Sequence, residues 1–257
     1  MDNRKIWEIA LGQSALECGC SPEDFLGKEN KIVLWEKREG ARVYLPPSLE
    51  CDLVSYGSNI VAQVSERLRD AVAEYIGRYP AVHCFETPNL YILNEALETY
   101  GQKICFMAEY FLPDVNLLRE RTCGFELRIL EQKDFADLYK PEWGNALCSQ
   151  RKEKDVLGVG AYRDGLLVGL AGASADCRDM YQIGIDVLPE YRKKGIASAL
   201  TSRLALEILR REKVPFYCAA WSNIPSVRNA TKCGFRPAWV QMTAREKEFV
   251  DQMNRKT

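Results

Sequence analysis

Two long apolar segments joined by a tight turn constrain the fold of this 257-residue chain more than any other feature. The segments are VLGVGAY (156–162) and LLVGLAGASA (166–175), and the turn between them contains Asp164 and Gly165. An Asp-Gly pair favours the type I′ turn, whose positive φ angles suit the twist of two adjacent antiparallel strands. We therefore predict an antiparallel β-hairpin at this point of the chain.

The segments around the hairpin have strand and helix patterns. Phe125, Leu127 and Ile129 alternate as in a half-buried strand. A strand at 180–188 ends before Pro189, because proline cannot donate to a central ladder. The other elements that we predict in this part are helices at 131–139, 141–150, 196–210 and 223–234 and strands at 214–221 and 235–242. Helices interleaved with strands in this way predict an α/β (α+β) fold.

The first 120 residues have weaker patterns. They suggest the order strand, helix, strand, helix, strand, at 51–56, 58–77, 81–86, 88–101 and 102–112. Residues 180–242 have the same order, so the two halves of the chain could be related, although α/β proteins also share such an order by chance. With a linker at 111–124, we predict an N-terminal α/β domain over 1–120 and a second domain over 121–257.

Composition excludes several classes of function. The formal net charge is −1, so a general attraction to nucleic acid or to an anionic membrane is not expected. The only histidine, His83, rules out a multi-histidine metal site, and no G-x-S-x-G motif accompanies it. The ten cysteines do not have zinc-ligand spacing. With neither a signal-peptide pattern nor a membrane-length apolar run, we expect a reduced, cytoplasmic protein without a metal.

A cationic loop stands between the strand that ends at Pro189 and the helix that begins near residue 196. It contains Arg192, Lys193 and Lys194, followed directly by Gly195. A helix N-terminus offers free backbone N–H groups and the positive end of the helix dipole, and glycine lets the backbone approach a ligand closely. Cations alone are typical of a solvated surface turn, but this setting predicts a site for an anion such as a diphosphate.

The stretch IDVLPEYRKKGIASAL (185–200) resembles the acetyl-CoA-binding signature of the GNAT superfamily of N-acetyltransferases, in which a Q/R-x-x-G-x-G/A loop wraps the pyrophosphate. The segment NIPSVRNATKCGF (223–235) is similar to the second coenzyme motif of the family. The resemblance covers residues 125–242 and implies a mixed, mostly antiparallel twisted sheet flanked by helices. A degenerate, GNAT-like N-terminal half would precede it, since SYGSNIVAQ (55–63) lacks the loop pattern.

The resemblance also assigns residues to acetyl-CoA. The backbone of the strand would pair with the pantetheine arm, the loop amides would hold the pyrophosphate, and Asn223 would meet the pantetheine from the next strand–helix junction. The implied coenzyme-binding residues are Ile185, Asp186, Val187, Arg192, Lys193, Lys194, Gly195, Ile196, Ala197, Ser198, Asn223 and Ser226. The implied reaction is direct attack of a substrate amine on the thioester, with no metal.

The usual catalytic residues of the family are absent. The position of its tyrosine acid holds Ala230, and the position of its glutamate base holds Tyr181 or Gln182. Tyr181 is our only catalytic candidate, and an ordinary strand tyrosine is the alternative reading. Trp143 could line the acceptor pocket or pack the helices around it.

Two other readings remain open at this stage. The chain could be a non-catalytic acyl-CoA-binding or sensing module, or it could bind nucleic acid through its basic loop. For an enzyme, the acceptor would be a primary amine of a small molecule or a peptide. The overall plan resembles tandem acetyltransferases, including the zwittermicin-resistance type. The N-terminal half could then cover the acceptor groove or form a homodimer.

Overall fold

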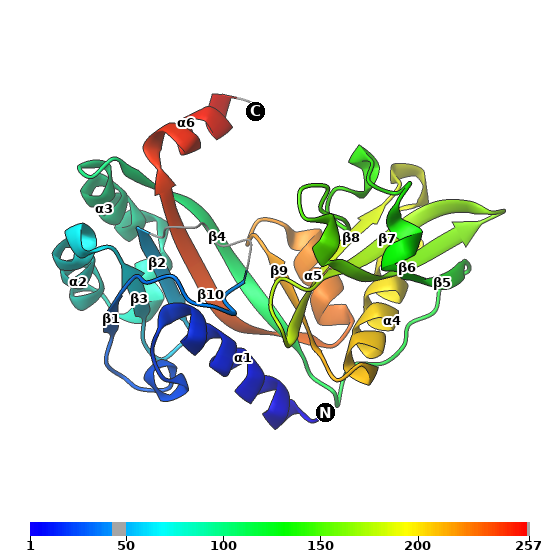
Figure 1. Cartoon of the computed structure of the whole chain (residues 1–257), viewed down its shortest axis with the longest axis horizontal. Coiled ribbons are helices and arrows are strands. Elements are labelled where there is room, and N and C mark those ends of the chain that lie inside the picture. The colour runs from blue at the N-terminus through cyan, green and yellow to red at the C-terminus, as the bar shows by residue number, and fades with distance from the viewer. Residues whose placement is uncertain (43–49, 256–257) are drawn as a thin grey trace. The chain divides into compact units, whose positions relative to one another are not determined.

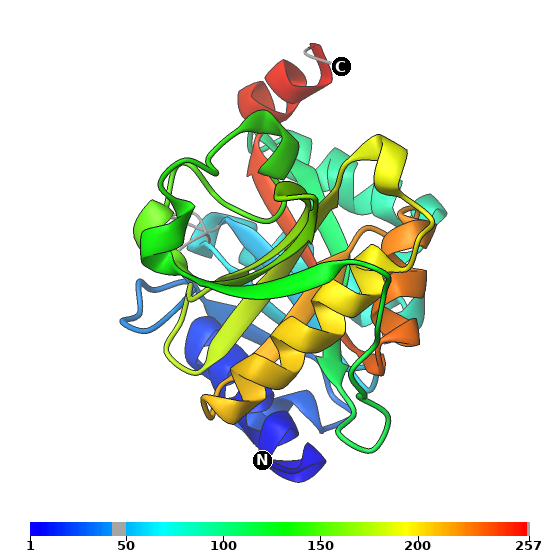
Figure 2. The ribbon, with the colours of Figure 1, turned by 90° about the vertical axis from the view of Figure 1, so that its right-hand side faces the viewer.

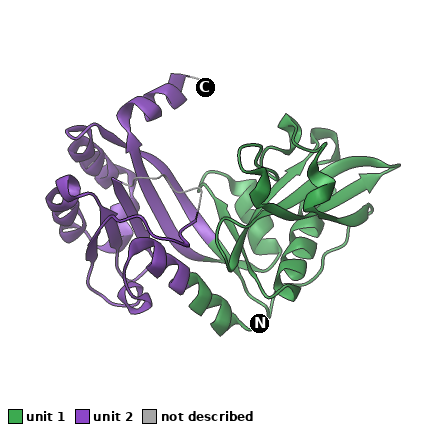
Figure 3. Ribbon diagram, in the orientation of Figure 1, with its two compact units in different colours: residues 1–10, 111–237 green, residues 11–110, 238–257 purple. Residues whose placement is uncertain are grey.

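The computed structural model describes residues 1–42 and 50–255. These residues form two compact units, one of residues 1–10 and 111–237 (unit 1) and the other of residues 11–110 and 238–257 (unit 2; Figure 3). These two units differ from the predicted domains 1–120 and 121–257. The last strand crosses from unit 1 into unit 2, where Val240 pairs with Ser55 and Thr243 with Asp52. The C-terminal segment therefore belongs with the N-terminal part of the chain.

Unit 1 contains the predicted hairpin. Its elements are β5 (Glu126–Glu131), β6 (Asp155–Arg163), β7 (Leu166–Ser174), β8 (Met180–Val187), α4 (Ile196–Arg210), β9 (Val214–Ala219) and α5 (Ile224–Lys232). The strands follow the order β9-β8-β7-β6-β5, with antiparallel pairing except between β8 and β9, which are parallel. Asp164 and Gly165 have φ angles of 50° and 80°, which confirms the type I′ hairpin. The mixed, mostly antiparallel sheet is thus as predicted.

The two faces of this sheet have different covers. Figure 2 shows α4 lying across the strands of one face, where Ile183, Leu200 and Leu204 belong to a large buried cluster. A smaller cluster contains Phe135, Trp143 and residues of β7 such as Leu170. The helices predicted at 131–139 and 141–150 are not observed. These segments instead contain the short 3₁₀ turns Gln132–Phe135 and Pro141–Trp143.

Unit 2 holds its own core. Its main elements are α1 (Asn3–Cys18, which begins in unit 1), β1 (Lys31–Leu34), β2 (Cys51–Ser55), β3 (Val61–Val64), α2 (Arg69–Arg78), α3 (Thr87–Glu98), β4 (Gln102–Pro113), β10 (Phe235–Glu246) and α6 (Lys247–Arg255; Figure 1). The strand order is β1-β3-β2-β10-β4. Leu53, Leu68 and Leu93 are fully buried in this core.

Two predicted elements of this part are wrong. Residues 61–64 are a strand, not helix, because β3 pairs with β1 on one side and β2 on the other and all four residues are buried. A strand buried on both faces has no polar alternation to identify it. Residues 81–85 form a 3₁₀ helix instead of a strand, with Cys84 O accepting a hydrogen bond from Tyr75 Oη at 2.8 Å. The element order that suggested two related halves is therefore not observed.

The described residues lack a metal-binding cluster and a membrane-spanning helix. Within 1–42 and 50–255, no group of three or more His, Cys, Asp or Glu side chains is arranged to hold a metal ion. In the same ranges, no helix combines the length and apolar character needed to cross a bilayer.

Candidate active site

The strands β8 and β9 separate partway along their length. Their parallel pairing joins Met180 with Val214, Tyr181 with Pro215 and Gln182 with Phe216, whereas β8 continues to Val187 and β9 to Ala219. Beyond the last pair, each strand has backbone N–H and C=O groups that face the diverging neighbour. Such groups require a partner, and an extended ligand chain could supply one by pairing with the strand edge.

The predicted cationic loop follows the free end of β8. Pro189–Tyr191 form a single 3₁₀ turn, and the Nε of Arg192 donates to the carbonyl oxygen of Val187 at 3.0 Å. Lys193 has a φ of 62°, a left-handed conformation that is uncommon for a residue with a Cβ. The loop is therefore held in a specific, costly backbone shape, of the kind that clusters at ligand-binding sites.

Gly195 is the N-cap of α4 and lies in the left-handed region with a φ of 82°. Ala199 is the first residue of α4 whose N–H reaches an acceptor one turn back, the carbonyl oxygen of Gly195 at 3.1 Å. The N–H groups of Ile196, Ala197 and Ser198 thus have no acceptor within the helix. They lie at the positive end of the helix dipole, beside exposed cations, which is a favourable setting for an anion.

The side chains of the predicted coenzyme residues on β8 point to opposite faces. Ile185 and Val187 pack against the cluster that includes α4, while Asp186 lies on the other face and accepts three hydrogen bonds from Asn145 and Ala146. The Oγ of Ser198 donates to Asn229 Oδ1 at 3.0 Å, within the helical layer. A role of these residues toward a coenzyme would therefore use their backbone.

Asn223 and Ser226 lie at the start of α5. The Oδ1 of Asn223 accepts a hydrogen bond from the N–H of Ser226 at 3.3 Å, so Asn223 caps the helix. The Oγ of Ser226 is 2.7 Å from the Oη of Tyr217, whose pKa is raised by burial. Both predicted side chains thus fix the junction between β9 and α5, and Asn223 itself is exposed there.

Tyr181 and Gln182 project to opposite faces of β8. The ring of Tyr181 packs against the large cluster on the α4 side. The Nε2 of Gln182 lies 3.1 Å from the Sγ of Cys218, on the strand across the opening. Of the two residues at the position of the usual glutamate, Gln182 has its polar group on the face away from α4. Ala230, at the position of the usual tyrosine, is fully buried.

The sequence analysis missed two buried aspartates, one at the start of β6 and the other just after the end of β7, which pairs with it. Asp155 is 1% exposed, accepts a hydrogen bond from the N–H of Cys148 at 2.9 Å, and has a pKa that burial raises to about 6. Asp176 is 2% exposed and forms an ion pair with Arg151. Neither acid lies in a motif, so only the folded chain reveals the cluster. Trp143 is also buried, at 4% exposure, so it packs the segment and does not line an open pocket.

Comparison with known proteins agrees with this geometry. The family model for GNAT acetyltransferase matches residues 96–238, which is more than half of the chain. No curated protein matches the chain in sequence.

The similar solved structures have low sequence identity to this chain. A GNAT-family protein from Novosphingobium aromaticivorans is 19% identical, with 56% of this chain and 66% of that chain covered and a TM-score of 0.46. A GNAT-family acetyltransferase from Colwellia psychrerythraea is 16% identical, with 56% and 57% covered and a TM-score of 0.40. An aminoglycoside N-acetyltransferase in complex with CoA is 20% identical, with 47% and 93% covered and a TM-score of 0.36. The chain thus spans less than two thirds of the first two relatives.

Membership rests on the family model. GNAT acetyltransferases transfer acyl groups from acetyl-CoA. The matched residues contain the diverging strands, the cationic loop and both helix N-termini described above. The chain belongs to the GNAT acetyltransferase family.

Proposed function

We propose that this protein is an N-acetyltransferase that moves the acetyl group of acetyl-CoA to a primary amine of a small molecule or peptide. The observation that carries the proposal is the divergence of β8 from β9 directly before a cationic loop that ends in Gly195, the left-handed N-cap of α4. Along the chain, the strand edge that suits an extended arm is followed by the helix N-terminus that suits a diphosphate. In coenzyme A, the extended pantetheine arm is likewise joined to a diphosphate.

Different residues would bind different parts of the coenzyme. The backbone of Ile185, Asp186 and Val187 would pair with the pantetheine arm, and the N–H groups from Lys193 to Ser198 would hold the pyrophosphate. Arg192, Lys193 and Lys194 would add positive charge, while Asn223 and Ser226 would border the arm from α5. An added Cβ at Gly195 would lie 4.0 Å from its nearest protein neighbours, so the glycine is needed for its backbone conformation and not for packing within the protein.

The reaction would be direct. The amine nitrogen attacks the thioester carbonyl carbon, a C–N bond forms, the C–S bond breaks, and the electron pair leaves with the sulfur, which takes up a proton as the amine loses one. Proximity in the ternary complex would supply most of the acceleration, and a backbone N–H near Val187 would stabilise the oxyanion. Tyr181 remains a candidate for proton transfer, and the carboxamide of Gln182, 3.1 Å from the Sγ of Cys218 on β9, is a polar group at the last pair of the two strands.

A non-catalytic acyl-CoA-binding module is the second candidate. It is favoured by the fully buried Ala230, which leaves no acid at the position of the family's tyrosine. The two candidates differ in one result, since an enzyme releases CoA in the presence of an amine and a binding module does not. The homodimer and the cytoplasmic location stay predictions.

The proposal is tested by CoA release with acetyl-CoA and a panel of spermidine, kanamycin and a short peptide with a free N-terminus. In parallel, acetyl-CoA at 100 times its Kd should stabilise the folded protein by about 2.7 kcal/mol. Gly195→Asp should abolish that stabilisation, because it places a carboxylate against the pyrophosphate site.

Gly165→Asp is the matched control. Gly165 also has a positive φ, 80°, and open space for a side chain, but it lies on the β6–β7 turn. It should keep the stabilisation by acetyl-CoA. CoA release with any amine supports the enzyme, whereas stabilisation without transfer to any amine supports the binding module. If wild type is not stabilised at all, both are refuted.

A further inference from the structure

The carboxylate of Asp186 holds a loop on β8. Its Oδ2 accepts the backbone N–H groups of Asn145 at 2.8 Å and of Ala146 at 2.9 Å, and its Oδ1 accepts the Nδ2 of Asn145 at 2.6 Å. Hydrogen bonds to an ionised acceptor are about twice as strong as neutral ones. The three donors engage both carboxylate oxygens, so a single side chain supplies three hydrogen bonds between the strand and the loop around Asn145.

Two glycines bring the same loop into direct contact with the sheet. A Cβ added to Gly184 would lie 1.8 Å from the carbonyl oxygen of Asn145, and a Cβ added to Gly172 would lie 2.0 Å from that of Ala146. Real Cβ atoms are not found so close to backbone, so only glycine permits this approach. Gly172 and Gly184 are partners in the β7–β8 register, so the carbonyl oxygens rest on one paired position of the sheet.

This loop borders the face of β8 from which an acceptor can reach the opening. On the α4 side, Ile183 is buried in the large cluster, and Ile185 and Val187 pack against it. Gln182, Gly184 and Asp186 alternate onto the other face. Along that face, the loop at Asn145 lies over Gly184, the second residue after Gln182, where pairing with β9 stops.

We propose that Asp186 is a positioning residue for the acceptor amine, acting through the loop at Asn145 and Ala146, and that its carboxylate binds neither coenzyme nor the acceptor ammonium. The inference rests on the proposed transferase function. The backbone of Asp186 lies opposite Leu170 in the β7–β8 ladder, and its side chain, engaged by three N–H donors, fixes the position of the loop that the acceptor would contact.

Asp186→Ala and Asp186→Asn separate these roles. Alanine removes all three acceptor bonds. Asparagine can keep the arrangement, because its Oδ1 can accept both backbone N–H groups and its Nδ2 can donate to Asn145 if the Asn145 carboxamide rotates by 180°. A carboxylate that bound an ammonium would lose its charge in both variants.

The measurement is steady-state kinetics with the best amine of the panel and with acetyl-CoA varied in turn. We expect Asp186→Ala to raise the acceptor KM by about tenfold, with the acetyl-CoA KM changed by less than about twofold. Asp186→Asn should stay within about threefold of wild type in both constants. Glu142→Gln, which neutralises an exposed carboxylate on the same segment, is the control and should match wild type.

Two results would overturn the proposal. One is a loss in Asp186→Asn as large as in Asp186→Ala, which would make the charge itself the ligand of the acceptor. The other is a raised acetyl-CoA KM with the acceptor KM unchanged. If Asp186→Ala is unstable, Asn145→Ala removes one of the three bonds and should raise the acceptor KM by a smaller factor in the same direction, and an unchanged acceptor KM there counts against the proposal.

Hydrogen exchange distinguishes a failure of this inference from a failure of the proposed function. If wild type acetylates no amine, the transferase proposal is refuted while the loop can still be examined. The amides of Asn145 and Ala146 should then exchange about tenfold faster in Asp186→Ala than in wild type or in Glu142→Gln. Equal exchange in all three proteins would show that Asp186 does not hold the loop.

Discussion

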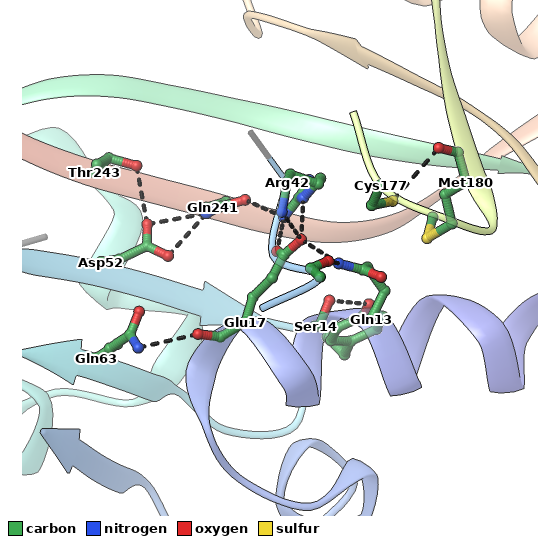
Figure 4. A network of polar contacts seen from close by, with 12 residues as sticks. Gln13, Ser14, Glu17, Arg42, Asp52, Gln63, Cys177, Met180, Gln241 and Thr243 are labelled. Carbon is green, nitrogen blue, oxygen red and sulfur yellow. Dashed lines mark hydrogen bonds and ion pairs between the residues drawn. The ribbon is translucent and has the colours of Figure 1, made fainter. Parts of the chain in front are cut away.

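Replacing Asp52 with asparagine should flatten the dependence of stability on pH between about pH 4 and 6. Asp52 is 3% exposed and its carboxylate accepts hydrogen bonds from Gln241 Nε2 at 2.8 Å and Thr243 Oγ1 at 2.9 Å (Figure 4). Burial outweighs these bonds and the nearby Arg42, and raises the pKa of Asp52 from 3.8 to about 6.

The sign and size follow from the two pKa values. An acid with a raised pKa binds its proton more tightly in the folded state than in the unfolded chain, so its contribution to stability is full below pH 3.8 and is lost as the pH rises through 6. A shift of about two pKa units corresponds to about 3 kcal/mol. The neutral side chain of Asp52→Asn lacks this contribution at every pH.

The assay is urea unfolding of wild type and Asp52→Asn at half-unit steps from pH 4 to 7. The difference in the free energy of unfolding between the two proteins should change by about 3 kcal/mol over this range, with wild type losing stability relative to the variant as the pH rises. Asp155, whose pKa is also raised, is present in both proteins and cancels. Asp164→Asn, on an exposed turn, is the control. A difference that stays constant with pH would refute the reasoning.

Three other expectations concern stability and thiol reactivity. Gly234→Ala should lower the free energy of unfolding by about 2 kcal/mol or more in urea denaturation, because Gly234 has a φ of 94° and a Cβ would lie 2.7 Å from the backbone nitrogen of Leu118; a loss below about 0.5 kcal/mol would count against this geometry. Tyr217→Phe removes the 2.7 Å hydrogen bond to Ser226 and should cost about 1 kcal/mol in the same assay, and an unchanged midpoint would contradict it. Cys51 is fully buried and burial raises its thiol pKa, so mass spectrometry of the native protein should show it unmodified by iodoacetamide at pH 8, and labelling as fast as in urea would contradict its burial.

The sequence predicted the parts of unit 1 that depend on short-range chemistry. Asp164-Gly165 specifies its turn through backbone preference, and Pro189 and Gly195 bound the loop between β8 and α4 in the same local way. These residues act within a few positions of themselves, so the hairpin and the N-terminus of α4 were both expected and observed.

The features that could not be predicted depend on residues far apart in the chain. The pairing of β10 with β2 joins residues about 190 positions apart, and no local pattern marks it. The contact between β8 and the loop at Asn145 was not predicted for the same reason. In the sequence, Asp186 has the pattern of an ordinary strand residue and Asn145 lies in a predicted helix, and only the fold brings them together. Gly172 and Gly184 were a further signal, since glycines within strands often mark a close backbone approach.

Calorimetric titration of the full chain with acetyl-CoA tests the central claim most directly, because it asks whether the loop at Arg192–Ser198 and the diverging strands bind the coenzyme. The account predicts one acetyl-CoA bound per chain with a Kd on the order of micromolar, and weaker binding as salt screens the cations of the loop. No detectable binding at acetyl-CoA concentrations of about a millimolar would contradict it.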